Sequence, residues 1–345
     1  MYNMKRLVTV LLPLIFSCAL ANALPGFKPA IQDLPGQYVY YGDRTFKRES
    51  YTGFMCFSES SYAARYYAPA VSAEKFPEID VEIYFTLNPE KNYIELTGER
   101  IISGFTPEEA EYVNYLHDLL YELNARRIKT PEANNAAYRK NDFFSQFGGQ
   151  VTIEFNPLVP LFNVLKIFQD EALPDLYVVT CGQITATTDK SFEKFTGFPE
   201  KYNDNRHSMP KVKKASKTEV TTADNQKFTI DSAWNQSMEN VWTLGDAALI
   251  SATTIPDAPE NFVTRQLLLS SGDRYLNWND YKFSNENGLI KIECIFYQPG
   301  TKNISRNFKV AKHNKDGYKF FTMTVYNNVY SKNKKYFDSI LKSYN

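Results

Sequence analysis

The chain has 345 residues, of which 43% are hydrophobic and 15% aromatic, and its 39 basic and 39 acidic side chains give a formal net charge of zero. This apolar content is enough for a packed core and excludes an intrinsically disordered chain. A neutral chain has no overall field to attract nucleic acid, so we expect no nucleic-acid partner. The length fits one large domain or, more comfortably, two.

The N-terminus has the features of a secretory signal peptide in the required order. Lys5 and Arg6 supply positive charge, residues 7–20 form an almost wholly apolar run, and Ala21-Asn22-Ala23 offers small residues at a cleavage site. The alternative is a membrane anchor, but a spanning helix needs about 20 apolar residues and this run is shorter. We therefore predict that residues 1–23 are a signal peptide and that the exported chain has no membrane span.

Cys18 gives the same stretch a second interpretation. It follows Ile15-Phe16-Ser17, which resembles a bacterial lipobox, although Phe16 is larger than the residue usual at its position. Lipidation of Cys18 would anchor the protein to a membrane, whereas cleavage after Ala23 would release it, and both alternatives stay open. The motif and the lack of many cysteines favour a bacterial envelope protein, located in the periplasm, at the outer surface or outside the cell.

Three cysteines, Cys56, Cys181 and Cys294, remain after removal of the signal peptide, and each lies in a strand-like run. An odd number leaves at least one free thiol in an oxidising compartment. Cys294 falls on the apolar side of an alternating run, which is typical of a core position. Buried thiols are therefore favoured over one disulfide or a reactive cysteine.

Residues 24–200 are predicted to form an N-terminal domain built on an antiparallel meander. Aromatic and β-branched residues indicate strands at 37–41, 51–57, 62–67, 79–87, 92–102, 150–155 and 176–186. Thr106, Pro107 and Glu109 form a capping box that predicts a helix over residues 107–127. Short helices are predicted at 161–169 and 189–195, and residues 133–149 are predicted to form a loop.

Residues 201–217 separate this part from the next. They lack apolar periodicity, contain Pro210 and carry six basic side chains, so a solvated linker is favoured over a basic patch for an anionic glycan or lipid. In the C-terminal domain, residues 218–345, a hairpin is predicted at 218–222 and 227–231, and strands at 247–255, 264–270, 289–297 and 318–326. Ser331 is a candidate cap for a last helix over residues 332–344. The predicted class is α+β, with two domains that each pack an antiparallel sheet with a few helices.

The C-terminal domain resembles a known family. Phe228-Thr229-Ile230-Asp231 followed by Trp234, and a closing helix that ends in Ile340-Leu341-Lys342-Ser343-Tyr344, make residues 218–345 similar to the PsbP-like α-β-α sandwich. Asp231 stands where that family prefers proline. The resemblance implies a non-catalytic binding or assembly module and identifies no functional residues, and no family is recognised for the N-terminal part.

Motifs that would indicate catalysis or a metal site are missing from the sequence. His117, His207 and His313 lie far apart, and neither His-Glu-x-x-His, Cys-x-x-Cys nor Gly-x-Ser-x-Gly occurs. We therefore predict no catalytic residue, no metal and no cofactor. A pair of catalytic carboxylates brought together from distant loops stays an alternative.

The remaining clue is the number of aromatic side chains. Tyrosine and tryptophan have an apolar face and a polar edge, which suits them to stack on sugars or hold a peptide. Simple packing in the core is the favoured explanation for most of them. The candidates for a binding surface are Tyr275, Trp278, Tyr281, Trp234 and Trp242.

These observations favour one function class over another. The first hypothesis is a non-enzymatic envelope protein that binds a glycan, a peptide or a protein partner. The alternative is an envelope hydrolase with dispersed catalytic carboxylates. A site with two or more convergent carboxylates of shifted pKa would favour the hydrolase, and an aromatic-lined site without them would favour the binding protein.

The mature N-terminus tests the signal-peptide prediction. We expect N-terminal sequencing of the exported protein to begin at Leu24, because residues 21–23 supply the small side chains of a cleavage site. A lipid-modified Cys18 at the N-terminus would establish the lipoprotein alternative. Exported material that begins at Met1 would contradict both.

Overall fold

The computed structural model describes residues 33–58, 60–71, 76–88, 93–101, 107–129, 137–140, 151–156, 159–169, 172–184, 192–199, 207–211, 216–256, 274–286, 289–298, 303–314 and 317–344. The predicted signal peptide with Cys18, the capping residue Thr106, the predicted strand 264–270 and most of residues 201–217 lie outside these ranges.

The described chain consists mainly of strands. Its helices are α2 (Pro107–Lys129), α4 (Asn327–Lys332) and α5 (Lys334–Ser343). Its strands are β1 (Gln37–Asp43), β2 (Ser50–Ser58), β3 (Ser61–Ala68), β4 (Ile79–Asn88), β5 (Tyr93–Ile101), β6 (Ala137–Lys140), β7 (Val151–Phe155), β8 (Val164–Phe168), β9 (Leu176–Gln183), β10 (Lys217–Thr221), β11 (Lys227–Asp231), β12 (Asn235–Met238), β13 (Val241–Leu244), β14 (Ala248–Ile255), β15 (Tyr275–Glu286), β16 (Leu289–Gln298), β17 (Asn303–Asn314) and β18 (Gly317–Tyr326).

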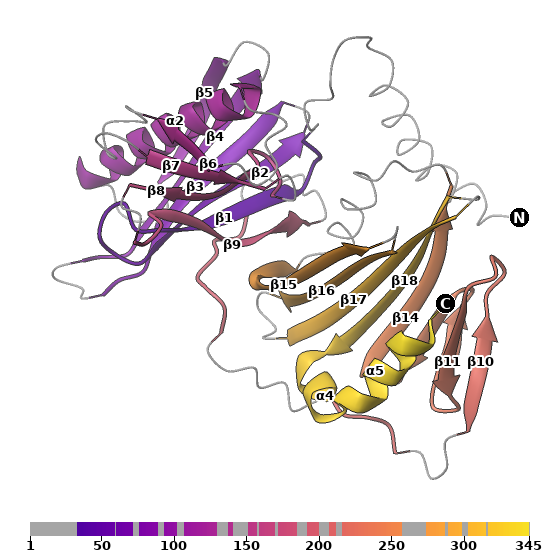
Figure 1. Cartoon of the computed structure of the whole chain (residues 1–345). Helices are drawn as coiled ribbons and strands as arrows, with labels where there is room; N and C mark the ends of the chain where they lie inside the picture. Colours follow the sequence, from indigo (N-terminus) through magenta and orange to yellow (C-terminus); the bar gives the residue numbers. More distant parts are fainter. Residues whose placement is uncertain are drawn as a thin grey trace, which may run out of the picture.

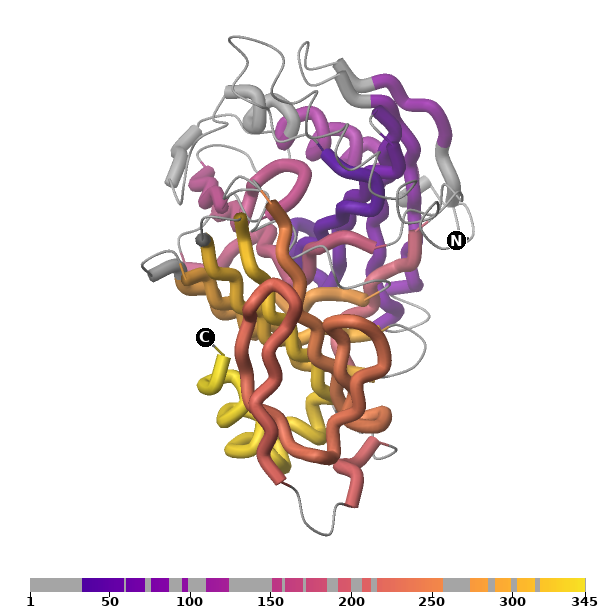
Figure 2. The backbone as a smooth tube through the Cα atoms, turned by 90° about the vertical axis from the view of Figure 1, so that its right-hand side faces the viewer, coloured from indigo at the N-terminus to yellow at the C-terminus, as the bar shows by residue number. Residues whose placement is uncertain are grey.

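One sheet runs through both halves of the chain, with the order β12-β13-β14-β18-β17-β16-β15-β9-β1-β2-β3-β4-β5. Every strand pair found among the described residues is antiparallel. Figures 1 and 2 show the indigo and purple strands of the N-terminal half in the upper part of the molecule and the orange and yellow elements of the C-terminal half in the lower part. The fold is therefore dominated by antiparallel sheet, and α+β describes it only loosely.

Strand β9 joins the two halves. One edge of β9 pairs with β1 along its length, while the other edge pairs with β8 at its start and with β15 farther along, where Asn277 lies opposite Thr180. Because the sheet continues across this junction, the division into domains at residues 201–217 stays a prediction.

Both faces of the N-terminal sheet are covered. All seven residues of β1 are buried: Val39 and Tyr41 face an inner core, whereas Tyr38 and Tyr40 face the other way. Helix α2 packs on the inner side of β3, β4 and β5, and its Leu116 is fully buried there (Figure 1). This double burial explains why the strand contains almost no residue typical of a solvent-facing surface.

The C-terminal sheet carries its helices on one face. Phe321 and Met323 of β18 pack in a core with Phe337 and Ile340 of α5 and with Phe228 of β11. In Figure 1 α5 and the β10–β11 hairpin lie side by side over this sheet. Packing of the amphipathic stripe of α5 is thus what closes the C-terminal half, as its sequence pattern predicts.

The structure confirms most of the predicted elements, including the α2 helix and the β10–β11 hairpin, and corrects others. Residues 161–169, predicted as a helix, hold strand β8, because Leu161 and Asn163 have positive φ values of 69° and 59° that break a helix. Within the predicted loop 133–149, Ala137–Lys140 forms strand β6 by pairing with β7.

Two further helix predictions differ from the structure. The described part of 189–195 contains no helix, and residues 192–199 are irregular. The last helix is broken at Asn333 into α4 and α5, and Ser331 does not cap it, because its hydroxyl donates back to the carbonyl of Asn327. Local patterns miss such breaks because tertiary contacts override them.

Cys56, Cys181 and Cys294 are fully buried, and no disulfide joins them within the described residues. Burial raises the pKa of the Cys294 thiol to about 12 and that of Cys181 further still. The preferred interpretation of these cysteines as buried thiols is therefore confirmed.

Asp224 fixes the turn of the β10–β11 hairpin to the sheet. Its carboxylate accepts hydrogen bonds from the hydroxyls of Thr222 in the turn and Thr254 in β14, and from Gln226 Nε2 at 2.7 Å. Its backbone carbonyl accepts from Lys319 Nζ at 2.6 Å. The Asp224 side chain thus connects the hairpin to β14, and its backbone carbonyl connects the hairpin to β18.

This contact makes stability depend on pH. Partial burial by itself would raise the pKa of Asp224, but the hydrogen bonds from Thr222, Thr254 and Gln226 together lower it. Such a carboxylate stabilises the fold above its unfolded pKa of about 3.9, and the contribution is lost as the pH falls. We expect Asp224→Asn to lower the free energy of unfolding by about 1–3 kcal/mol at pH 7. The difference from the wild type should narrow below about pH 4 in urea denaturation.

Asp246→Asn is the matched control, because Asp246 is exposed and makes no hydrogen bond with a described side chain. We expect it to change the free energy of unfolding by less than about 0.5 kcal/mol at either pH. An Asp224→Asn effect that is equal at pH 7 and pH 3 would show that the carboxylate charge does not hold the hairpin.

Candidate functional site

The outer face of the N-terminal sheet is covered by a piece of the chain without secondary structure. This outer face is the side of β1, β2, β3 and β9 that carries Tyr38, Tyr40, Met55, Ala63 and Val179, and residues 192–199, here called the strap, lie against it. Within the described residues the strap forms no backbone–backbone hydrogen bond. Side chains of the outer face and of the strap itself therefore hold the strap in place.

Glycines opposite tyrosines shape the outer face. Tyr40 lies opposite Gly53 in the β1–β2 register, and its ring occupies the space that a Cβ at Gly53 would need. Tyr38 likewise lies opposite Gly182 across β1 and β9. The Tyr40 ring can occupy this place only because Gly53 lacks a side chain, whereas a Cβ at Gly182 would lie 3.3 Å from the Tyr38 hydroxyl.

Aromatic side chains of the strap recur at every third residue and contact these tyrosines. The Phe192 and Phe195 rings both lie 5.4 Å from the Tyr40 ring, and Phe195 also lies 5.3 Å from the ring of Tyr275 in β15. Phe198 continues the row, 5.0 Å from Phe195. Pairs of this kind contribute about 0.5–1.5 kcal/mol each beyond the burial of their area.

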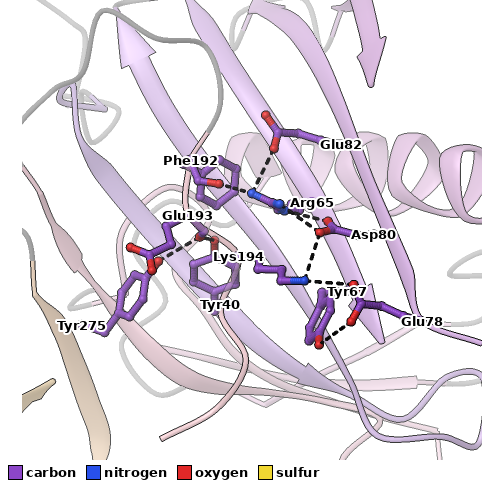
Figure 3. Close-up of polar contacts among 10 residues, drawn as sticks. All are labelled: Tyr40, Arg65, Tyr67, Glu78, Asp80, Glu82, Phe192, Glu193, Lys194 and Tyr275. Carbon is purple, nitrogen blue, oxygen red and sulfur yellow. Dashed lines mark hydrogen bonds and ion pairs between the residues drawn. The ribbon is translucent and has the colours of Figure 1, made fainter. Parts of the chain in front are cut away.

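Three side-chain donors bind two successive carbonyls of the strap backbone. The guanidinium of Arg65 donates to the carbonyl of Phe192. The hydroxyls of Tyr40 and Tyr275 both donate to the carbonyl of Glu193, the latter at 2.8 Å. Figure 3 shows Tyr40 and Tyr275 pointing toward Glu193 from two different strands. The strap is thus recognised through its backbone as well as through its aromatic rings.

A charged cluster lies beside these donors (Figure 3). Arg65 on β3 forms two hydrogen bonds with Asp80 on β4, at 2.9 and 3.0 Å, and its Nη1 lies 3.3 Å from Glu82 Oε2. From the strap, Lys194 Nζ lies 3.0 Å from Glu78 Oε1 and 3.6 Å from Asp80 Oδ2. Arg65, Asp80 and Glu82 are buried. Removal of one partner from a buried ion pair costs about 3–5 kcal/mol, because the other charge is left uncompensated.

The protonation states suit binding of a neutral backbone. Burial by itself would lower the pKa of Arg65, but hydrogen bonds and charges of its carboxylate partners raise it, so it stays a cation. Burial raises the pKa of Tyr40 and of Tyr275 well above its usual value, so both hydroxyls keep the protons that they donate. The pKa of Glu193 is also raised by burial, against the opposing effect of Arg65.

The five predicted binding residues lie in three different places. Tyr275 is part of the outer face, whereas Trp278 and Tyr281 stack on each other, 4.8 Å apart, in a bulge of β15 against the inner core. Trp234 and Trp242 are buried in the C-terminal core, with Trp234 Nε1 donating to the Tyr336 hydroxyl. The structure therefore does not assemble them into one surface, and their binding role stays a prediction.

Sequence reasoning missed the residues that hold the strap, namely Tyr40, Arg65, Asp80 and Lys194. A signal was present in two strands: Arg65 sits among small and aromatic residues, and Asp80 and Glu82 alternate with Ile79, Val81 and Ile83. Charges on one face of alternating strands indicate a polar outer surface. The sequence gives no sign that another segment covers it.

Two family models, both of unknown function, match separate parts of the chain. Residues 36–193 match the family described as Domain of unknown function (DUF7954), and residues 218–345 match Domain of unknown function (DUF7955). No curated protein matches the sequence.

Among solved structures, one match is the solution structure of cyanobacterial PsbP (CyanoP) from Synechocystis sp. PCC 6803, with 14% identity and a TM-score of 0.27, covering 40% of this chain and 97% of that chain. The PsbP-like resemblance is confirmed as a distant likeness of one segment, and the N-terminal part has no recognised family of known function.

The described ranges contain neither a helix that could span a membrane nor a cluster of potential metal ligands. No helix there is both long and apolar enough to cross a membrane. No group of three or more histidine, cysteine, aspartate or glutamate side chains gathers there in a way that could hold a metal ion.

A substitution at Gly53 tests the packing of Tyr40 on the outer face. Gly53→Ala should displace the Tyr40 ring, because the new Cβ would overlap it, and lower the free energy of unfolding by about 1–3 kcal/mol. Gly98→Ala is the matched control, since a Cβ there would make an ordinary contact 3.5 Å from Tyr84 Cδ2. Denaturant unfolding measures both variants. Equal effects of the two substitutions would contradict a specific role for Gly53.

Proposed function

We propose that this protein is an exported, non-enzymatic binding or assembly module of a bacterial envelope, and that its outer face binds an extended peptide segment of a protein partner. The observation that carries the proposal is the strap. A stretch of the chain lies on the outer face in the way that a peptide ligand would, held by side chains and without a backbone ladder.

Because no backbone ladder is found between the strap and the described strands, a partner peptide could replace the strap. A strand in a sheet could leave only by breaking several backbone hydrogen bonds together, whereas the strap is attached to described residues by separate side-chain contacts. Departure of the strap would leave the sheet intact and expose the tyrosines beneath it. A partner segment with the same features could then take its place, which is a recognised way for proteins to bind peptides.

The contacts define the ligand chemistry. Rings at every third residue would occupy the positions of Phe192, Phe195 and Phe198, next to Tyr40 and Tyr275. A basic residue two positions after the first ring would meet Glu78 and Asp80, as Lys194 does. The preferred partner is therefore an extended segment with the spacing aromatic-x-basic-aromatic.

The hydrolase alternative has less support at this site. Arg65 and Lys194 form ion pairs with Asp80, Glu82 and Glu78, and carboxylates held in ion pairs are poorly placed to transfer protons. Glu193 is the strap's own carboxylate, and its raised pKa alone does not make an acid–base pair. In the proposal the acidic groups bind a cation and do not catalyse.

The proposal keeps the two-domain organisation and the export of the chain. Residues 24–200 form the binding domain and residues 218–345 an appended domain connected by the 201–217 linker. Tyr275 of the second domain completes the site, so assembly of the two domains would control access to it. The envelope location follows from the signal-peptide features of residues 1–23.

A peptide added in trans tests the proposal. We expect a labelled peptide of residues 190–200 to bind the full-length triple variant Phe192→Ser, Phe195→Ser and Phe198→Ser, in which the native strap has lost its rings. Its affinity for the wild type should be at least about tenfold lower, since the strap already occupies the outer face. Fluorescence anisotropy measures both, and circular dichroism checks that the variant keeps its sheet.

Two controls make the result specific. A peptide with serine in place of its three phenylalanines should not bind. In the strap variant, Tyr275→Phe should weaken binding of the native peptide about fivefold, because it removes one hydrogen bond worth about 1 kcal/mol. Tyr281→Phe should leave the affinity unchanged, because the Tyr281 hydroxyl has no hydrogen-bond partner among the described residues. If the peptide binds neither protein, the outer face is not a peptide site.

A further inference from the structure

A second concave site lies at the turn between β1 and β2. Its cavity measures about 490 Å³, and Arg44, Lys47 and Arg48 supply three cationic side chains to its wall. Glu49, Tyr51 and Tyr177 also line it. A volume of this size belongs to the range in which proteins bind small molecules, about 300–1,000 Å³.

Two of the cations are held in place. The Arg44 guanidinium lies 4.8 Å from the centre of the Tyr177 ring, and Tyr177 in turn occupies the space over Gly42. The Arg48 guanidinium donates to the carbonyls of Pro69 at 2.7 Å and Pro77 at 3.0 Å. Side chains fixed in this way lose less conformational entropy when they bind a ligand.

The cations of this cavity have no anionic partner in the described chain. Arg44, Lys47 and Arg48 form no ion pair there, whereas Arg65 and Lys194 nearby each contact two carboxylates. The one buried carboxylate in the cavity wall, Asp43, already accepts hydrogen bonds from Thr52 and Tyr115 and from the backbone N–H of Thr45.

Asp43 therefore does not neutralise the guanidinium groups. Burial, which outweighs these hydrogen bonds, raises its pKa and so disfavours its charged form.

The other lining groups favour a hydroxylated ligand. Tyr51 and Tyr177, which carry hydroxyls, and Glu49, which accepts a hydrogen bond from the Tyr51 hydroxyl, line the same cavity. Such groups form hydrogen bonds with sugar hydroxyls, and arginine pairs with a carboxylate or a phosphate through two parallel hydrogen bonds. We propose that this cavity binds an anionic sugar unit, with Arg44, Lys47 and Arg48 on the anionic group and the tyrosine hydroxyls on the ring.

This proposal does not depend on peptide binding, because in the described chain the cations of the cavity do not contact the strap. The two sites share Tyr51, which lines the cavity and packs edge-on against Phe195 of the strap at 5.1 Å, and Tyr177, which lines the cavity and packs against the outer-face cluster. Variants for the test therefore leave Tyr51 and Tyr177 unchanged, so that failure of one proposal is distinguishable from failure of the other.

Calorimetric titration of the full-length protein tests the cavity with four probes: glucuronate, glucose 6-phosphate, inorganic phosphate and glucose. We expect both anionic sugars to bind, inorganic phosphate to bind at least about tenfold more weakly, and glucose not to bind. The affinities should fall as salt is raised, because ions screen the attraction. The relative affinities of glucuronate and glucose 6-phosphate identify the anionic group.

The double variant Arg44→Gln and Lys47→Gln should lose at least about tenfold in affinity for the anionic sugars while keeping its melting temperature, since both side chains are exposed. Lys312→Gln, an exposed lysine on β17, is the matched control and should bind as the wild type does. Equal binding of phosphate and the anionic sugars would overturn the sugar part of the proposal. No binding of any anion, or an unchanged affinity in the double variant, would overturn the proposal as a whole.

Discussion

The tyrosines of β1 are buried on both sides of the sheet, and each must find a partner for its hydroxyl. Tyr41 on the inner side donates to the carbonyl of Val164, while on the outer side Tyr40 donates to Glu193 and Tyr38 to Arg274. A buried hydroxyl without a partner costs about 1–3 kcal/mol, so these contacts are required wherever the rings are buried. The three acceptors come from three segments far apart in the sequence. One strand therefore fixes the position of β8, of the strap and of the start of β15.

Charge is used in two opposite ways on the same half of the molecule. Beneath the strap, Arg65 is buried and fully engaged by Asp80 and Glu82, so its charge is neutralised within the fold. At the β1–β2 turn, Arg44 and Arg48 are fixed by an aromatic ring and by carbonyl groups, which hold a guanidinium without neutralising it. The first arrangement binds the chain to itself. The second leaves positive charge available to a ligand, and in our proposals the two arrangements correspond to the peptide site and the anion site.

Tyr51 connects these two sites physically. It forms part of the cavity wall, packs against Phe195, and donates a hydrogen bond from its hydroxyl to Glu49 at 3.1 Å. The hydroxyl also lies close to Gly197, where a Cβ would come within 2.9 Å of it and where the φ of 97° favours glycine. A ligand that moves Tyr51 would therefore also change the contacts of the strap, so that the two proposed binding events would influence each other.

The sequence by itself determined the local elements whose residues meet the same requirement in any context. The helix α2, the β10–β11 hairpin with its turn at Asn225, the amphipathic α5 and the buried thiols were all predictable from spacing and residue type. Only the tertiary structure decided what covers each face. Val164–Phe168 became a strand because β7 and β9 offered edges to pair with. The first carbonyls of the strap are bound by the side chains of Arg65, Tyr40 and Tyr275. Periodicity shows that a side chain is turned to one side of a strand, but the partner on that side comes from distant segments, which no local pattern encodes.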